Sequence, residues 1–437
     1  MGSSCSPRVG IHALGCKLNQ SELEDYARRL KAYGVVLVGG HEKADVYILN
    51  TCTVTAESDR KVRQWLRRAR RQNAAALIVA AGCSVTRERE VLSRIADVVL
   101  DNNEKSNLPE VVIERLAHLS CRQVPGTERP WRPRTRAMVK IQEGCSMACT
   151  YCVIPLVRGG ERSRPVGDVV DDVIDRIREG HLEIVLTGTR PGAYAAADIR
   201  LSGLVEQILC IDGLQRVRLS SLQPHELSPD VLRLWSDSRV CPHVHMSLQS
   251  GSGSVLRRMR RPYSPAAFLA AMEKLRDAAP YMAITTDVIV GFPGETDSEF
   301  VETLEFCEKA RFSRIHVFPY SARPGTAAAE MGDQVPRCVL RERVAAMSRL
   351  AAWSRTEYER TCVGTVRSVL WEEEVRSGNG MFAGTTDDYV RVFTDCDVRL
   401  NTVERVVVDC VDKGRVMVRR LREDSCRSET ELESARH

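Results

Sequence analysis

Short apolar segments alternate with helical segments along the first part of this chain. The apolar segments have the length and composition of buried strands, and the segments between them have helical periodicity. Strands and helices that alternate at this spacing predict a doubly wound parallel sheet with helices on both faces, an α/β fold. The predicted strands are residues 9–14, 44–49, 76–81 and 98–100, and the predicted helices are residues 20–33, 55–72 and 108–119.

The same alternation resumes after residues 122–136, a segment rich in proline, glycine and arginine that we interpret as a linker. The strands that follow are too few for a complete eight-stranded barrel, so a partial (β/α)6 barrel of the TIM type is predicted. The predicted strands are residues 137–141, 183–186, 216–219, 244–248, 284–290 and 315–318, and the helices between and after them include residues 166–179, 265–278 and 341–361.

From residue 364 onward the sequence changes to short β-rich stretches with turn signals between them. The stretches at residues 366–371, 388–392, 402–409 and 414–420 predict a small antiparallel β-barrel of the kind that binds nucleic acids. The final residues are polar and without period, which is typical of a disordered tail. We therefore expect an N-terminal α/β unit at 7–121, a linker at 122–136, a parallel barrel at 137–361, a small β-barrel at 362–423 and a tail at 424–437.

The composition argues for a cytoplasmic protein that does not enter a membrane. No apolar run approaches the roughly 20 residues of a membrane span, and the N-terminus lacks the apolar stretch of a secretory signal. The chain has 437 residues and 16 cysteines. Because the cytoplasm keeps thiols reduced, clustered cysteines are expected to bind a metal or a metal cluster instead of forming disulfides. The net charge of +5 is compatible with an RNA partner but does not require one.

The strongest local pattern is the spacing CxxxCxxC of Cys145, Cys149 and Cys152, directly after a predicted barrel strand. Cysteine thiolates are the usual ligands of iron–sulfur cubanes. Three of them leave one iron open, and an open iron can chelate the amino and carboxylate groups of S-adenosylmethionine. A structural zinc ion would need a fourth ligand, which no nearby Cys or His supplies. The sequence therefore predicts a [4Fe-4S] cluster at the carboxyl end of the barrel.

A second set of cysteines shares a position in the N-terminal unit. Cys16, Cys52 and Cys83 each follow a predicted parallel strand. Because ligands of open α/β sheets bind outside the carboxyl ends of the strands, we expect these three side chains to converge on one site. Each alone could be an ordinary buried cysteine. The other ten cysteines share no such position, and we interpret them as structural.

At these residues the chain resembles the radical-SAM methylthiotransferases, over nearly its whole length. The individual strings are short, but their order along the chain is specific to the family. They are GCKLNQSE at 15–22, NTCTVT at 50–55, AGCS at 81–84, VKIQEGCSMACTYCVIP at 139–155, EIVLTG at 183–188, HVHMSLQSGS at 243–252 and DVIVGFPGET at 287–296. The family architecture is an N-terminal α/β domain, a radical-SAM barrel and a C-terminal TRAM barrel.

The resemblance implies an enzyme that replaces a C–H bond by C–S–CH3. Cys145, Cys149 and Cys152 would hold the cluster that cleaves S-adenosylmethionine, and Cys16, Cys52 and Cys83 would hold an auxiliary [4Fe-4S] cluster that supplies or carries sulfur. The cofactors are thus two [4Fe-4S] clusters and S-adenosylmethionine. The implied partners are a tRNA anticodon stem-loop, a sulfur donor and a one-electron donor protein of the flavodoxin or ferredoxin type.

The strings GCKLNQSE and NTCTVT resemble the branch that acts on N6-threonylcarbamoyladenosine, which lies 3′ of certain tRNA anticodons. Other branches act on N6-isopentenyladenosine or on an aspartate of a ribosomal protein, and both remain alternatives. Branches that act on isopentenyladenosine tend to have Gln-Met in place of Lys17-Leu18. An alternative of another class is a non-catalytic RNA-binding metalloprotein.

Residues at the ends of predicted barrel strands are candidates for binding S-adenosylmethionine. They are Gly188, Ser220, Gln249 and Gly291. The loop after Gly188 departs from the family pattern, because Arg190 and Pro191 stand where relatives usually carry Asn and an apolar residue. A run of cations near Cys52 is either a solvated helix face or a contact with RNA phosphates. It consists of Arg60, Lys61, Arg63, Arg67, Arg68, Arg70 and Arg71.

Overall fold

The computed structural model describes residues 6–117, 131, 134–375 and 380–421. Its N-terminal unit is a five-stranded parallel sheet with the strand order β2-β1-β3-β4-β5. The strands are β1 (Arg8–Ala13), β2 (Val36–Gly39), β3 (Val46–Thr51), β4 (Leu77–Gly82) and β5 (Val98–Leu100). The helices are α1 (Lys17–Ala32), α2 (Ala56–Gln72), α3 (Cys83–Leu92), η1 (Lys105–Asn107) and α4 (Leu108–Ala117).

Both faces of this sheet are buried, as the prediction of a doubly wound sheet requires. Val9, Ile48 and Val79 pack on one face against α1 and α4. Tyr47 and Ile78 pack on the other face against α2 and α3. The strands are apolar on both sides because helices cover both sides.

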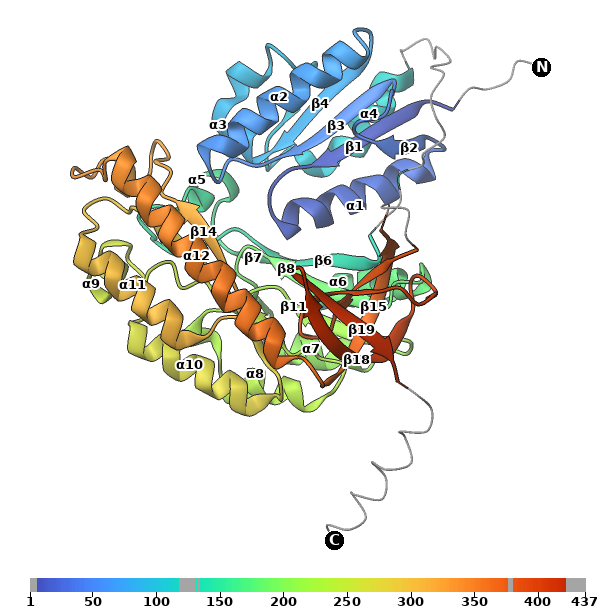
Figure 1. Ribbon diagram of the computed structural model, residues 1–437. Coiled ribbons are helices and arrows are strands. Elements are labelled where there is room, and N and C mark those ends of the chain that lie inside the picture. Colours follow the sequence, from blue (N-terminus) through green and yellow to red (C-terminus); the bar gives the residue numbers. More distant parts are fainter. Residues whose placement is uncertain (1–5, 118–130, 132–133, 376–379, 422–437) are drawn as a thin grey trace.

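Among the described residues, the second unit is an open barrel of six parallel strands, and its helices lie on the outside of these strands (Figure 1). The strands are β6 (Arg136–Glu143), β8 (Glu183–Gly188), β11 (Arg216–Leu219), β12 (His243–His245), β13 (Ala283–Val290) and β14 (Arg314–Pro319). The helices are α5 (Ile154–Arg158), α6 (Val166–Arg178), α7 (Leu201–Leu209), α8 (Pro229–Arg233), α9 (Gly253–Arg258), α10 (Pro265–Ala278) and α11 (Asp297–Ala310). Parallel bridges, Val217 to Val240 and Leu222 to Met246, join the halves of the barrel between β11 and β12.

Small elements complete the barrel unit. β7 (Arg162–Ser163) pairs antiparallel with β6, and β9 (Ala195–Ala196) pairs with β10 (Ile199–Arg200). Four short 3-10 helices lie in its loops: η2 (Pro191–Ala193), η3 (Pro224–Glu226), η4 (Leu234–Ser236) and η5 (Ala327–Ala329). A single apolar core, which includes Phe268 and Phe312, joins the strands to the surrounding helices.

The long helix α12 (Arg337–Thr361) crosses the outside of the barrel and leads into the C-terminal unit (Figure 1). That unit is a closed barrel with the strand order β15-β16-β17-β19-β18, packed around Trp371. Its strands are β15 (Val366–Glu374), β16 (Phe382–Thr386), β17 (Arg391–Thr394), β18 (Val403–Asp412) and β19 (Arg415–Arg420). The barrel is not wholly antiparallel as predicted, because β17 and β19 close it as a parallel pair.

The structure confirms the predicted fold class and adds elements that the sequence pattern did not reveal. Strand β2 (VLVG) is apolar but only four residues long, and β16 (FAGTT) contains a glycine and few apolar residues. Helix α3 begins at Cys83 itself, and β6 begins at Arg136, within the predicted linker. Residues 122–130 of that linker and the predicted tail at 424–437 lie outside the described residues, and the exact unit boundaries remain a prediction. No described helix has the length and hydropathy needed to cross a membrane.

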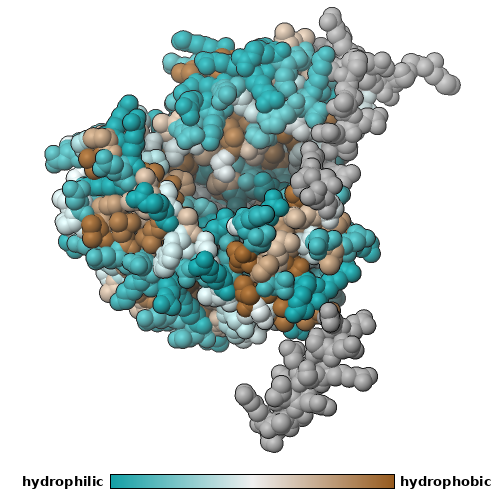
Figure 2. Space-filling model, in the orientation of Figure 1, coloured by the Kyte–Doolittle hydropathy of each residue, from teal (hydrophilic) through white to brown (hydrophobic). Residues whose placement is uncertain are grey.

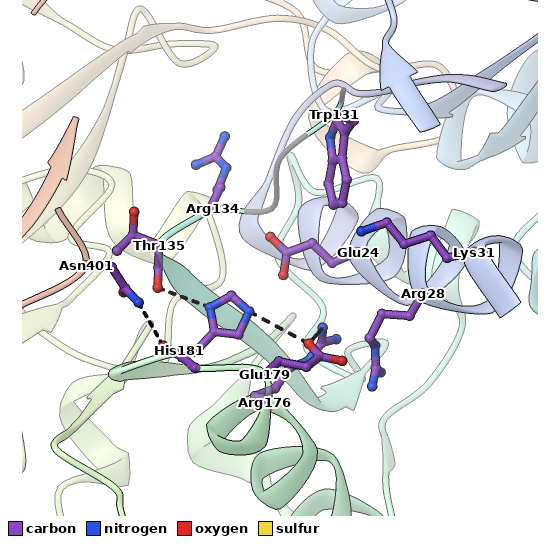
Figure 3. Close-up of a pocket in the computed structure, with 11 residues that line it drawn as sticks. Glu24, Arg28, Lys31, Trp131, Arg134, Thr135, Arg176, Glu179, His181 and Asn401 are labelled. Atoms are coloured by element: carbon purple, nitrogen blue, oxygen red, sulfur yellow. Dashed lines mark hydrogen bonds and ion pairs between the residues drawn. The ribbon is translucent and has the colours of Figure 1, made fainter. Parts of the chain in front are cut away.

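Helix α1 packs between the N-terminal sheet and β6 of the barrel. A cavity of about 590 Å³ lies beside this contact, between α1, the end of α6 and the C-terminal unit (Figure 3). Glu24 of α1 lines this cavity, and its Oε2 atom accepts a hydrogen bond of 3.3 Å from the backbone N–H of Met138. Burial raises the pKa of Glu24 to about 7, although this hydrogen bond and nearby arginines oppose the change.

The raised pKa predicts a pH-dependent effect of Glu24→Gln. The folded chain binds a proton at Glu24 more tightly than the unfolded chain does, so this side chain lowers stability progressively as the pH rises from about 4.5 to about 7. We expect Glu24→Gln to raise the melting temperature by a few degrees at pH 8 and by less at pH 5. Glu114→Gln, on the exposed side of α4, is the control. Equal effects of Glu24→Gln at both pH values would contradict the prediction.

Candidate active site

The first three predicted cluster ligands lie in the loop between β6 and α5, at the carboxyl end of the barrel. Cys145, Cys149 and Cys152 line one cavity of about 270 Å³. Gly144 starts this loop with a φ of +78°, and a Cβ atom there would lie 1.9 Å from the carbonyl oxygen of Gly160. Only glycine fits this close approach, which turns the chain from the strand into the cysteine loop.

These thiols influence one another and are surrounded by polar donors. The pKa of Cys152 is raised to about 12, first by burial and then by the neighbouring Cys149 and Cys145. The Cys149 sulfur accepts a hydrogen bond of 3.4 Å from the guanidinium of Arg261. The Cys145 sulfur accepts one of 3.4 Å from the backbone N–H of Met147. The structure thus brings the three predicted ligands together beside a cation that can compensate thiolate charge.

The second set of cysteines converges at the carboxyl edge of the N-terminal sheet. Cys16 precedes α1, Cys52 follows β3, and Cys83 is the first residue of α3. The pKa of Cys52 is raised to about 11 by burial and then by Cys16 and Cys83, so all three thiols are neighbours. Gly15 has a φ of +99°, and a Cβ atom there would lie 2.6 Å from the Cys52 sulfur. The glycine lets the backbone before Cys16 approach Cys52.

Each of the two donor sets consists of three thiols, which are the usual ligands of iron–sulfur clusters. Among the described residues, no group of three or more His, Cys, Asp or Glu side chains is arranged to hold one metal ion. The Cys83 sulfur also accepts a hydrogen bond of 3.2 Å from the buried guanidinium of Arg158. Two sets of three thiols, each beside an arginine, can therefore each hold a cluster.

A further cavity reaches the second set of cysteines and adjoins the cavity of the first set. It has a volume of about 440 Å³, and Cys16 lines it on the side of the N-terminal unit. Ser221 and Asp287 line both this cavity and the one that contains Cys145, so the two cavities adjoin. The space-filling view shows a hollow between the N-terminal unit and the barrel (Figure 2). We call the 440 Å³ space the central cavity.

The residues predicted to bind S-adenosylmethionine occupy different places. Gln249 lines the cavity of Cys145, whereas Gly188 and Ser220 line the central cavity. Gly291 lies against Leu340 of α12, where a Cβ atom would approach Leu340 to 2.5 Å. The structure thus gives Gly291 a packing role, and its contact with S-adenosylmethionine remains a prediction, as it does for the other three.

Arg190, which departs from the family pattern, forms several hydrogen bonds beside the first cysteine set. Its guanidinium donates to Glu226 at 2.5 Å and to Glu161 at 2.9 Å, and it lies 2.8 Å from a ring nitrogen of His225. Its backbone N–H donates to the side chain of Gln142. These bonds compensate the charge of Arg190 within the loop, so the altered residue has partners of its own.

Sequence reasoning missed a buried ion network that joins the two units. Arg158 of α5 donates to Glu22 of α1 at 3.0 Å and to Glu143 of β6 at 2.6 Å. Lys105 donates to the same two carboxylates at 2.6 and 2.9 Å. Burial opposes ionisation, but Arg158 and Lys105 hold the pKa of Glu22 well below its usual range. Glu22 lies within the string GCKLNQSE, but nothing in its spacing indicated a partner more than 100 residues away.

Comparisons with known proteins agree with this geometry. The model of the radical SAM superfamily matches residues 139–307, and that of the uncharacterized protein family UPF0004 matches residues 8–101. The threonylcarbamoyladenosine tRNA methylthiotransferase MtaB of Bacillus subtilis is 37% identical over 88% of this chain and 89% of its own length. The chain belongs to the radical-SAM methylthiotransferase family.

Two other similar proteins show the range of this family and fold. The tRNA-2-methylthio-N(6)-dimethylallyladenosine synthase of Parafrankia is 38% identical over 86% of this chain and 81% of its own length. The solved radical S-adenosylmethionine methyltransferase TsrM of Kitasatospora setae has a TM-score of 0.54 at 14% identity, covering 74% of this chain and 77% of that one. A radical-SAM enzyme carries a [4Fe-4S] cluster and uses S-adenosylmethionine, so this methylthiotransferase does so as well.

The ion network predicts a large cost for Arg158→Met. The substitution would leave Glu22 and Glu143 with one fewer cation in a buried site, and breaking such a network costs about 3–5 kcal/mol. We expect the free energy of unfolding, measured by urea titration under nitrogen, to fall by about this amount. Arg178→Met, at an exposed arginine of α6, is the matched control and should change stability by less than about 0.5 kcal/mol. Similar values for the two variants would contradict the role of the network.

Proposed function

We propose that this enzyme converts N6-threonylcarbamoyladenosine of tRNA into its 2-methylthio derivative. The observation that carries the proposal is that the central cavity, which Cys16 lines, adjoins the cavity of Cys145, Cys149 and Cys152. A methylthiotransferase must activate a C–H bond and deliver sulfur to the same carbon, and adjoining cavities allow one substrate to meet both sites.

We assign a different part of the reaction to each of the two cysteine sets. Cys145, Cys149 and Cys152 hold the cluster that binds S-adenosylmethionine, and Cys16, Cys52 and Cys83 hold a second [4Fe-4S] cluster. When bound, S-adenosylmethionine would supply the methyl group, the first cluster would pass on an electron from a separate donor, and the second cluster would supply the sulfur atom. Arg261 and Arg158 each donate to one sulfur, which stabilises thiolates in a site partly closed to water.

The substrate assignment draws on the relatives. The Bacillus subtilis protein, and a protein of the same name from Thermotoga maritima at 36% identity, match about nine tenths of their own lengths. Their names specify threonylcarbamoyladenosine of tRNA. We propose the tRNA anticodon stem-loop as the macromolecular substrate, an electron donor of the flavodoxin or ferredoxin type, and a separate sulfur donor. An enzyme that modifies tRNA would act in the cytoplasm.

A specific observation favours a second candidate substrate. The Parafrankia relative, named for dimethylallyladenosine, has an identity one percentage point above that of the Bacillus protein. Identity alone therefore does not choose between the two modified adenosines. The ribosomal-protein substrate has no such support among these relatives.

Nucleoside analysis tests the substrate directly. In a strain that lacks this gene, we expect mass spectrometry of digested tRNA to show no 2-methylthio-N6-threonylcarbamoyladenosine and an increase in its precursor. Restoring the intact gene should restore the product, whereas a gene encoding Cys149→Ala should not. The 2-methylthio derivative of isopentenyladenosine, where the strain makes it, serves as the internal control. Loss of that derivative instead would contradict the proposal and support the second candidate.

A further inference from the structure

The central cavity has a surplus of positive charge on its walls. Its cationic residues come from α1, from the segment before β6, and from β6 and β14, and they are Lys17, Arg134, Arg136 and Arg314. Asp287 is the one acidic residue among those that line the cavity, and its carboxylate lies 3.2 Å from His245. Arg136 is compensated by Glu372 at 2.9 Å. The remaining cations make the cavity suited to an anionic ligand.

Lys17 is the most conspicuous of these cations because it is half-buried without a carboxylate partner. It is the first residue of α1, directly after Cys16. Its ammonium lies 5.3 Å from the ring centroid of Tyr389, which Arg136 and Arg218 also approach to 5.3 and 5.0 Å. No carboxylate of the described residues forms an ion pair with Lys17 or Arg314. A half-buried ammonium beside other cations is stabilised when an anion binds next to it.

The C-terminal unit holds this arrangement in place. Tyr389 lies in the turn before β17 with a φ of +71°, and its ring packs 4.5 Å from that of His243. Arg218 donates to Glu183 at 2.7 Å and to the backbone carbonyl of Asp387 at 2.8 Å, which ties that turn to the barrel. Lys17 therefore lies against a wall that is anchored to both the barrel and the C-terminal unit, and the carboxylate of Glu183 in this wall is paired with Arg218.

We propose that Lys17, assisted by Arg314, binds the carboxylate of the threonylcarbamoyl group on the target adenosine and thereby selects this nucleoside. The inference rests on the proposed function, and it identifies the substrate's carboxylate as the group that the central cavity recognises. The threonylcarbamoyl group ends in a carboxylate, which supplies the partner that Lys17 lacks. An isopentenyl group is a hydrocarbon, so it would cover these cations without compensating them.

The position of Lys17 relative to the cysteines fits this role. Because it directly follows Cys16 and lines the same cavity, an anchored N6 substituent would lie on the side of the second cysteine set. Ser221 and Asp287 connect that space to the cavity of Cys145, Cys149 and Cys152. A nucleoside held by its carboxylate could thus present its base between the two sets. A phosphate of the RNA is the other source of an anion, and the test separates the two.

The test compares the binding of three anticodon stem-loops to the anaerobically reconstituted protein. The adenosine 3′ of the anticodon is unmodified in the first, carries the threonylcarbamoyl group in the second, and carries its methyl ester in the third. We expect the intact protein to bind the second at least about 10-fold more tightly than the other two, as for a charge-assisted hydrogen bond. Lys17→Met should remove most of this preference, and Arg314→Met should reduce it.

Lys274→Met, at an exposed lysine of α10, is the matched control and should keep the full preference. An equal loss of affinity of Lys17→Met for all three stem-loops would show a phosphate contact and overturn the inference. So would an unchanged preference in Lys17→Met, provided that thermal unfolding shows both lysine variants folded. The proposed function is tested separately, by whether the unsubstituted protein thiolates the second stem-loop. If it does, the outcomes above concern only the role of Lys17. If it does not, the result counts against the proposed function itself.

Discussion

The buried guanidinium of Arg158 fixes how the two α/β units meet. It contacts Glu22 and Asn19 of α1, Glu143 of β6 and the sulfur of Cys83, and its side chain is 1% exposed. Charges removed from water need several well-placed partners, and these partners come from both units. The network therefore favours one orientation of the sheet on the barrel. Lys105, which contacts the same carboxylates, reinforces it.

This orientation brings together the carboxyl ends of two parallel sheets. In each unit the loops at those ends carry three cysteines, and the central cavity lies between them. Parallel strands place the loops that follow them at one edge, so each fold delivers its own cysteines without regard to their distance in sequence. The contact between the units then places the cavity of Cys16 next to the cavity of Cys145, Cys149 and Cys152. The C-terminal barrel contributes Tyr389 to the wall of the central cavity.

The parts of this picture that follow from local patterns could be predicted from the sequence. The strands β3 and β4 are continuously apolar, and the cysteines after them have a shared position, so the sheet and the convergence of Cys52 and Cys83 were predictable. The spacing of Cys145, Cys149 and Cys152 likewise indicated their loop. Strand β16 was not predicted because its sequence has little apolar character. Its position depends on pairing with β15 and β17. The network of Arg158 and the cations around Lys17 join residues from distant segments, which no local pattern reveals.

The central claim is that the two cysteine sets perform separate steps on one substrate. It is tested most directly by following 5′-deoxyadenosine and the methylthio nucleoside in the same reaction, for the reconstituted protein and for Cys52→Ala and Cys149→Ala. The account predicts that Cys52→Ala still cleaves S-adenosylmethionine but yields no thiolated nucleoside, and retains about half of the iron. It predicts that Cys149→Ala yields neither product. Full thiolation by Cys52→Ala, or bound zinc with no cleavage of S-adenosylmethionine in the intact protein, would contradict it.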